Sequence, residues 1–164
     1  MLLYHGSNVG VETPRLFNQK RGLDFGAGFY LTSKKEQAIS FSKTVCRRAK
    51  SGVPTVSVYE FDEASAGSGL EILRFTQPDE HWLDFVKQNR LKIYNGKQYD
   101  VIIGPVADDA VLPTIQAFVI GQFTIEVAIA ALKTSRLFDQ HCLATDKALA
   151  ILKFIESFVV QEGE

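Results

Sequence analysis

Cysteine and histidine are scarce in this sequence of 164 residues. The two cysteines, Cys46 and Cys142, lie far apart and form no Cys-x-x-Cys pair. This spacing excludes a disulfide framework and a zinc site built on paired cysteines, and it favours a reducing compartment. His5, His81 and His141 are equally scattered along the chain. We therefore expect no metal.

Long apolar runs and an excess of one charge are also missing. No run approaches the roughly 20 apolar residues that span a bilayer, and the first residues lack the basic and apolar pattern of a leader. The formal net charge is −1, which argues against bulk electrostatic capture of nucleic acid or anionic membrane. Lys20-Arg21 and Arg47-Arg48 with Lys50 are short basic stretches, typical of a solvated surface, with a phosphate-rich ligand as the alternative. The sequence predicts a cytoplasmic protein without a membrane partner.

Phosphate-binding fingerprints and internal repeats are absent as well. No G-x-x-x-x-G-K-[ST] loop occurs and no G-x-G-x-x-G stretch opens a helix, so the nucleotide-binding folds with those fingerprints are not indicated. Residues 63–69 resemble a linker but are too short to separate domains. Residues 8–25 form a long loop of the kind that is often functional. The length suits one domain, residues 1–164.

Apolar patterning predicts an irregular alternation of strands and helices. Strands are predicted at residues 2–5, 28–32, 53–61, 70–75, 99–103 and 137–144. Helices are predicted at residues 33–50, 78–89, 109–120, 125–133 and from 145 to about 160, with Ser33 as the first N-cap. The predicted fold class is α+β, with a split, mostly antiparallel β-sheet core and flanking helices.

The stretch LYHGS, residues 3–7, ends a short strand with His5 and Gly6. Such a histidine is either a core or edge residue or a group at the mouth of a cleft, where Gly6 lets a ligand approach the backbone. The stretch DFGAGFYLT, residues 24–32, places Gly26 and Gly28 around a tight turn before Tyr30. Its plain alternative is a loop followed by a strand with a core tyrosine.

The stretch FDQHCLA, residues 138–144, puts a glutamine and a histidine into a strand. Alternation places Phe138, Gln140 and Cys142 on one face of that strand. It places Asp139 and His141 on the other. A glutamine on a partly apolar face is costly unless it is hydrogen-bonded or lines a pocket. The alternative is a strand-end glutamine that bonds a neighbouring loop.

In this order the three stretches resemble the ADP-ribosyltransferase superfamily, in its His-Tyr-Glu branch with diphtheria toxin and the poly(ADP-ribose) polymerases. That branch carries HG[ST] on its first strand, GxGxYF on its second and xE on a late strand. The corresponding residues here are His5-Gly6-Ser7, Gly26-Ala27-Gly28-Phe29-Tyr30 and Asp139-Gln140-His141. The chain is also similar to small bacterial domains with the pattern LYHGS…DFGxGFYLT…QA. The resemblance spans nearly the whole chain and implies an ADP-ribosyltransferase-like split sheet.

The resemblance implies NAD as a co-substrate, without a metal, and a catalytic set of His5, Tyr30 and Gln140. His5 would bond a hydroxyl of the adenosine-side ribose, and Tyr30 would pack on the nicotinamide ring. Gln140 stands where many active relatives have glutamate. Glutamine keeps a hydrogen bond to the nicotinamide-ribose 2′-hydroxyl but loses the charge that stabilises an oxocarbenium ion, a loss of about 10²-fold in rate.

Four further residues are implied to bind the co-substrate. Gly6 would offer its backbone to the nicotinamide amide, Ser7 would support that turn, and Gly28 belongs to the glycine turn. Phe41, on the following helix, would supply the second face of the aromatic stack. A core residue of an amphipathic helix is the alternative for Phe41.

Several other charged residues are further candidates for the same site. For Asp139, Glu126, Asp108 and Asp109 a structural role is favoured over catalysis, whereas Asp24 could organise the glycine turn. Arg15 or Arg21 could meet the NAD pyrophosphate. No motif fixes the position of either arginine.

The resemblance thus implies a mono-ADP-ribosyltransferase that modifies a macromolecule, protein or nucleic acid, and a role as a bacterial toxin or effector. A cognate antitoxin or regulator is a further partner that the resemblance suggests. The alternatives are a non-catalytic module that holds NAD, ADP-ribose or a protein partner, and a plain interaction domain.

Overall fold

Seven strands form two sheets in the computed structural model, which describes residues 1–17, 22–66, 69–106, 111–133 and 138–161. The strands are β1 (Leu2–Ser7), β2 (Phe29–Leu31), β3 (Thr55–Phe61), β4 (Ile72–Arg74), β5 (Val101–Pro105), β6 (Asp139–Leu143) and β7 (Leu152–Val159). The helices are α1 (Lys35–Ala49), α2 (Glu63–Ala66), α3 (Glu80–Arg90), α4 (Leu112–Val119), α5 (Ile125–Lys133) and α6 (Asp146–Leu149). None of these helices is both long and apolar enough to cross a bilayer.

The first sheet has the order β1-β3-β7 and the second the order β2-β6-β5-β4. All strand pairs are antiparallel except β4–β5, which is parallel. Backbone hydrogen bonds of 2.8 and 3.0 Å between Tyr4 and Thr32 join the two sheets at β1 and the end of β2. The predicted α+β class with an antiparallel-rich core is confirmed.

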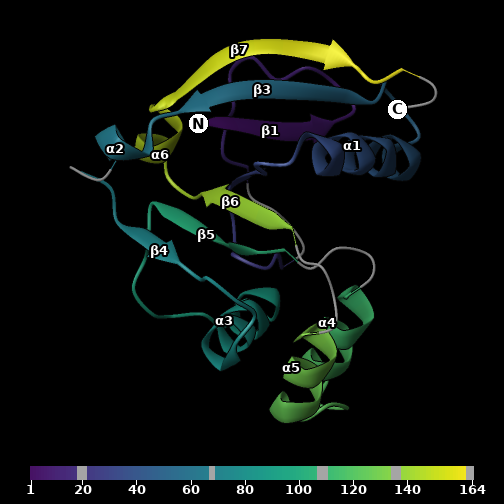
Figure 1. The fold of residues 1–164 in the computed structure, drawn as a ribbon, viewed down its shortest axis with the longest axis vertical. Helices are drawn as coiled ribbons and strands as arrows, with labels where there is room; N and C mark the ends of the chain where they lie inside the picture. Colours follow the sequence, from purple (N-terminus) through teal and green to yellow (C-terminus); the bar gives the residue numbers. More distant parts are fainter. Residues whose placement is uncertain (18–21, 67–68, 107–110, 134–137, 162–164) are drawn as a thin grey trace.

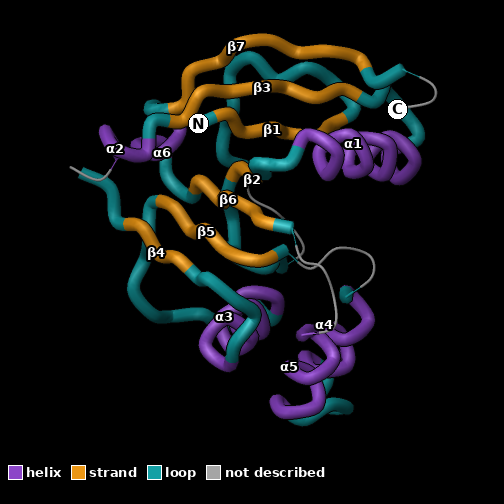
Figure 2. The backbone as a smooth tube through the Cα atoms, in the orientation of Figure 1, coloured by secondary structure: helices purple, strands orange, loops and turns teal. Residues whose placement is uncertain are grey.

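The molecule is layered around the second sheet (Figures 1 and 2). One face of this sheet packs on α3, α4 and α5 through a core that includes Trp82, Ile102 and Cys142. Its other face packs toward the first sheet through a core that includes Val101 and Leu143. Neighbouring residues of β5 and β6 thus enter opposite cores, as the period of two in a strand requires.

Helix α1 begins later than predicted, and Ser33 is not its cap. The N-cap is Lys34, whose side chain makes no capping bond. Its backbone N–H instead donates to Thr32 Oγ1 at 3.1 Å. The Ser33 hydroxyl donates to Asp139 Oδ1 at 2.8 Å, so β6 already uses the group that would have capped the helix.

The predicted C-terminal helix is wrong. Helix α6 ends at Leu149, and residues 152–159 form β7, which pairs with β3. Ile155 is an extra residue between the pairs Tyr59–Phe154 and Val58–Glu156. Such a bulge turns the following side chains to the other face of the sheet. Because of this change of face, the apolar residues of β7 do not alternate with the period of two that is typical of a strand. Their spacing in the sequence resembles that of a helix.

The other predicted elements are present with shifted ends. Strands 2–5, 28–32, 53–61, 70–75, 99–103 and 137–144 correspond to β1 to β6 in order. Helices 33–50, 78–89, 109–120 and 125–133 correspond to α1, α3, α4 and α5. Asp79 caps α3 by accepting a hydrogen bond of 3.0 Å from the Trp82 backbone N–H. This capping residue lies before the first helical residue, which explains why the sequence predicted a helix from residue 78 onward.

Candidate functional site

A large cavity lies where β1, α1 and the start of β6 come together. Its volume is about 1010 Å³, at the upper end of the range for small-molecule sites. Residues 9–17, the turn before β2 and one side of α4 complete its walls. The lining contains all seven site residues that the sequence indicated: His5, Gly6, Ser7, Gly28, Tyr30, Phe41 and Gln140.

His5 lines the cavity and uses one of its two ring nitrogens inside the protein. Its Nδ1 lies 2.7 Å from the carbonyl oxygen of Tyr30. A carbonyl oxygen can only accept, so Nδ1 carries the proton and Nε2 of the neutral ring is an acceptor. The ring stacks on Phe29 with centroids 4.3 Å apart. Burial lowers the pKa of His5 and outweighs the opposite effect of the bond to Tyr30, which favours the neutral ring.

Tyr30 uses its hydroxyl to hold the glycine turn. The hydroxyl donates to the carbonyl oxygen of Gly26 at 2.6 Å and accepts from the backbone N–H of Phe25 at 3.1 Å. Burial raises its pKa well above the usual value, and the neighbouring Cys142 adds to this effect. The phenol therefore fixes the turn, and Tyr30 is at the same time one of the residues that line the cavity.

Gly6 and Gly28 are required by packing inside the protein. A Cβ on Gly6 would lie 2.1 Å from the carbonyl oxygen of Ala38 in α1. A Cβ on Gly28 would lie 2.4 Å from Cys142 Sγ. Since real Cβ contacts are never so short, glycine is needed for α1 to pack on β1 and for β2 to pack on β6. Their presence in the sequence therefore has a structural cause that applies with or without a ligand.

Residues 9–17 form a wall that the sequence did not reveal. Alternate residues line the cavity, as along one face of a strand: Val9, Val11, Thr13, Arg15 and Phe17. The backbone N–H of Val11 donates to Ser57 Oγ at 2.9 Å, and the Tyr59 hydroxyl donates to the Val11 carbonyl. Ser7 begins this wall, and its hydroxyl lies 3.5 Å from Asn8 Oδ1. The period of two in residues 9–17 is the sequence signal that could have indicated this wall.

Gln140 is buried, with 6% of its surface exposed, yet it lines the cavity. Its Nε2 has no hydrogen-bond partner among the described residues. A buried donor without a partner costs about 1–3 kcal/mol. The predicted alternation is confirmed, because Gln140 faces the cavity while Asp139 turns to α1. Of the two interpretations of Gln140, the pocket-lining one fits and the loop-bonding one does not.

Asp139 ties the start of β6 to the start of α1. Its carboxylate accepts from the Ser33 hydroxyl at 2.8 Å and from the Ser33 backbone N–H at 3.2 Å. Its Oδ2 lies 3.3 Å from His141 Nδ1. Burial alone would raise the pKa of Asp139, but His141 and Ser33 outweigh burial and bring it to about 2. The structural role predicted for Asp139 therefore fits its contacts.

One face of α1 lines the cavity. Its residues are spaced by four, three and four positions, the spacing of a helical face: Gln37, Phe41, Thr44 and Arg48. The Phe41 side chain is 48% exposed, so the alternative of a core residue is wrong. The same spacing from Phe41 could have indicated Arg48, which the sequence analysis did not place in the site.

Asp24 and Arg90 form an ion pair at the cavity wall, with Asp24 Oδ1 2.6 Å from the guanidinium. Asp24 precedes the glycine turn, so this pair ties the chain before the turn to Arg90 of α3, which also lines the cavity. That Asp24 organises the turn stays a prediction. Arg15 also lines the cavity, whereas Arg21 and the two aspartates at 108 and 109 lie outside the described residues. Glu126 is exposed in the first turn of α5.

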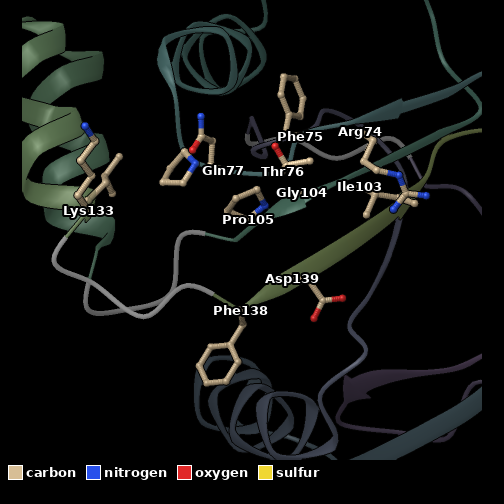
Figure 3. A pocket seen from close by; sticks show the side chains of 12 residues that line it. Arg74, Phe75, Thr76, Gln77, Ile103, Gly104, Pro105, Lys133, Phe138 and Asp139 are labelled. Atoms are coloured by element: carbon tan, nitrogen blue, oxygen red, sulfur yellow. The ribbon is translucent and has the colours of Figure 1, made fainter.

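A second hollow of about 550 Å³ lies between the ends of β4 and β5 and helix α5. Figure 3 shows Lys133 at one end of it and Arg74 at the other, with Phe138 and Asp139 at the start of β6. It contains none of the seven indicated residues. Across the described ranges, no group of three histidine, cysteine or acidic side chains is placed to hold a metal ion.

The chain was compared with known families, curated proteins and solved structures. No curated protein and no solved structure matches it. One family model matches residues 1–154, nearly the whole chain. The chain therefore belongs to the family described as "Protein of unknown function (DUF3990)".

Proposed function

We propose that the protein is a mono-ADP-ribosyltransferase that uses NAD as co-substrate and has the ADP-ribosyltransferase form of the split sheet. One observation carries the proposal: His5, Tyr30 and Gln140, from three different strands, line one cavity. Their resemblance to one motif set lies in the sequence alone, so their meeting in one cavity is an independent observation. The proposed biological role is that of a bacterial toxin or effector that is inhibited by a cognate antitoxin or regulator.

The polar groups of the cavity complement a ribose and an amide. His5 Nε2 is an acceptor and suits a ribose hydroxyl as donor, because Nδ1 is already bonded. Gln140 Nε2 is a buried donor in need of an acceptor, such as a hydroxyl oxygen of the second ribose. Ligand binding would then remove the cost of the unpartnered amide.

Tyr30 and Phe41 line the same cavity, and their rings would supply flat apolar surface to a ligand. A nicotinamide ring between them would gain the offset or edge contacts that aromatic pairs favour. Phe41 suits this role because its side chain is held in no core.

In the proposed reaction, the bond between nicotinamide and C1′ of the ribose breaks, and nicotinamide leaves with the bonding electron pair. A lone pair of the acceptor forms the new bond to C1′, and the acceptor releases a proton to solvent. The ribose passes through a state with oxocarbenium character. Among the described lining residues the carboxylates are Asp24, which is paired with Arg90, and Glu36. Without a carboxylate at position 140, we expect slow turnover.

A second candidate function is a non-catalytic module that holds NAD or ADP-ribose in the same cavity. The observation that favours it is the neutral side chain of Gln140, which can bind a hydroxyl but cannot balance a developing positive charge. Both candidates use the same contacts of His5 and Tyr30. They differ in whether the nicotinamide bond breaks.

The experiment incubates the full chain with NAD labelled in its adenylate part, with and without cell lysate. Nicotinamide release and transfer of the label to macromolecules are measured for the wild type, His5→Ala and Gln140→Ala. His81→Ala is the matched control, since His81 is exposed on α3. Transfer lost in the two cavity variants and kept in the control supports the transferase. Saturable NAD binding without nicotinamide release supports the module, and no binding of NAD overturns both.

A further inference from the structure

The lining of the large cavity contains few carboxylates. Among its described residues they are Asp24 and Glu36. Asp24 is buried, and its Oδ1 lies 2.6 Å from the guanidinium of Arg90, so its charge is already balanced. The Asp139 carboxylate does not belong to this lining and accepts hydrogen bonds from Ser33. Glu36 is therefore the described lining carboxylate that can place a negative charge beside a ligand.

Glu36 lies in the first turn of α1, and its side chain is exposed. Within the ranges that the structure describes, no ion pair joins it to a basic side chain. Glu36, Ser40 and Thr44 all line the cavity, and their spacing of four residues puts them in one row along the helix. A negative charge in the first turn also stabilises a helix through its dipole. That structural role explains the residue type but not its place in the cavity wall.

The start of α1 is tied to the start of β6. The hydroxyl and the backbone N–H of Ser33 donate to the Asp139 carboxylate at 2.8 and 3.2 Å. Gln140 directly follows Asp139 in β6. Helix α1 begins at Lys35, and one turn of a helix rises only about 5 Å. The first turn, with Glu36, therefore lies next to the junction that also holds Gln140.

A further hydrogen bond fixes the first turn of α1 at this junction. The Thr32 hydroxyl donates to Gln37 Oε1 at 2.6 Å. Gln37 follows Glu36, and both line the cavity together with Thr32 and Gln140. Glu36 and Gln140 thus belong to the same end of the cavity.

A charged group at this end would matter for the proposed reaction. A ribose that loses nicotinamide develops positive charge as it takes on oxocarbenium character. A carboxylate opposes this charge more strongly in the transition state than in the ground state, which accelerates the step. The amide of Gln140 can bond a ribose hydroxyl, but it carries no charge. Water screens an exposed carboxylate, so we expect a smaller effect from Glu36 than from a buried one.

We propose that Glu36 supplies the negative charge that Gln140 lacks in the transfer of ADP-ribose. This inference rests on the proposed function and adds a catalytic residue to it. Glu36 forms no bond to the ribose. Nicotinamide leaves with the bonding electron pair, a lone pair of the acceptor forms the bond to C1′, and the proton of the acceptor goes to solvent.

The first test measures nicotinamide release and NAD affinity of the full chain with Glu36→Gln. Glu12→Gln is the matched control, because Glu12 is exposed, lies between two lining residues and is itself not part of the lining. We expect release at saturating NAD to fall about tenfold in Glu36→Gln alone, with NAD affinity changed by less than about twofold. Glu36→Asp keeps the charge and should retain more of the rate than Glu36→Gln.

A purely structural role would lower the free energy of unfolding and leave the rate at saturating NAD unchanged, so urea denaturation of each variant accompanies the kinetics. An unchanged rate in Glu36→Gln, or an equal loss in Glu12→Gln, overturns the inference. No nicotinamide release by the wild type overturns the proposed transfer and this inference with it. Release that Glu36→Gln leaves unchanged overturns the inference alone.

The second test places Glu36→Gln in a Gln140→Glu background. If Glu36 replaces the missing charge, a carboxylate at position 140 makes it redundant. The loss of rate caused by Glu36→Gln should then shrink from about tenfold to about twofold or less, a coupling that only residues with a shared role show. An equal loss in both backgrounds means that the two positions act independently, and this result overturns the inference.

Discussion

His5 Nδ1 donates a hydrogen bond of 2.7 Å to the backbone carbonyl of Tyr30. This bond couples β1 to β2 and leaves Nε2 as the ring atom that can accept from a ligand. The histidine thus has one contact inside the protein, and its other ring nitrogen is the one that the proposed site would use. A substitution that keeps the first and removes the second tests the binding role alone.

His5→Asn is that substitution. An asparagine amide can occupy the place of Nδ1 and donate to the Tyr30 carbonyl, but it has no atom at Nε2. We expect NAD affinity to fall about tenfold, the worth of one hydrogen bond, with a small change in the free energy of unfolding. Calorimetric titration with NAD measures the first and urea denaturation the second. An unchanged affinity in His5→Asn would remove His5 from the proposed site.

The lowered pKa of His5 predicts how binding depends on pH. Since burial depresses the pKa of His5 below 6.5 in the folded protein, the neutral ring is the major form at and above pH 6.5. Nε2 therefore remains an acceptor, and NAD affinity should be constant from about pH 8 down to about pH 6.5. Affinity should fall at lower pH, where the ring gains a proton. The free energy of unfolding should fall in the same window, because the unfolded chain binds a proton first. A decline in affinity that begins above pH 7 would contradict this assignment.

Gly6→Ala should destabilise the protein without any ligand. Its Cβ would lie 2.1 Å from the Ala38 carbonyl oxygen, a backbone atom that cannot rotate away. We expect a loss of about 3 kcal/mol in the free energy of unfolding, measured by urea denaturation. Gly69→Ala is the control, because its Cβ would have no neighbour within 4 Å among the described residues, and it should change stability by less than about 0.5 kcal/mol. Equal effects in the two variants would show that α1 can move away from β1.

Local patterns predicted most of this fold, and long-range pairing decided the rest. Strands such as β1 and β3 carry their signal in their own residues, so their positions were confirmed. β7 could not be found, because the bulge at Ile155 depends on β3, which lies about a hundred residues earlier in the chain. Ser33 was wrong as a cap for a similar reason, since its hydroxyl is bonded to Asp139 of a distant strand.

In the candidate site, too, the residues were predictable from local sequence patterns, whereas their long-range contacts were not. The motif residues His5, Tyr30 and Gln140 were indicated from the sequence and line one cavity. The bond of the Tyr30 hydroxyl to Gly26 and the pairing of Arg90 with Asp24 were not predicted, because they depend on how the turn and α3 pack together. Motif spacing selects residue types, whereas the orientation of each polar group is set by tertiary contacts.

Asp139→Asn should weaken the junction of β6 and α1 in a pH-dependent way. A pKa moved from 3.8 to about 2 means that the charged carboxylate stabilises the folded state, by about 2 kcal/mol. This stabilisation is complete above pH 3.8 and is lost as the pH falls toward 2. The difference in unfolding free energy between wild type and variant should therefore be large at neutral pH and shrink in acid. Glu156→Gln, an exposed carboxylate of β7, serves as the control and should show no such difference.

Gln140→Glu tests whether charge limits the proposed reaction. A carboxylate at this buried position would balance the developing positive charge of the ribose, so nicotinamide release should rise about 100-fold. The same carboxylate would lack a partner in the free protein, so the free energy of unfolding should fall. Gln116→Glu adds equal charge on α4 in the same cavity, at an exposed position, and separates a local effect from a general one. Acceleration in Gln140→Glu alone would place the reacting ribose at β6. Equal rates in the wild type and both variants would favour the module that binds NAD without cleaving it.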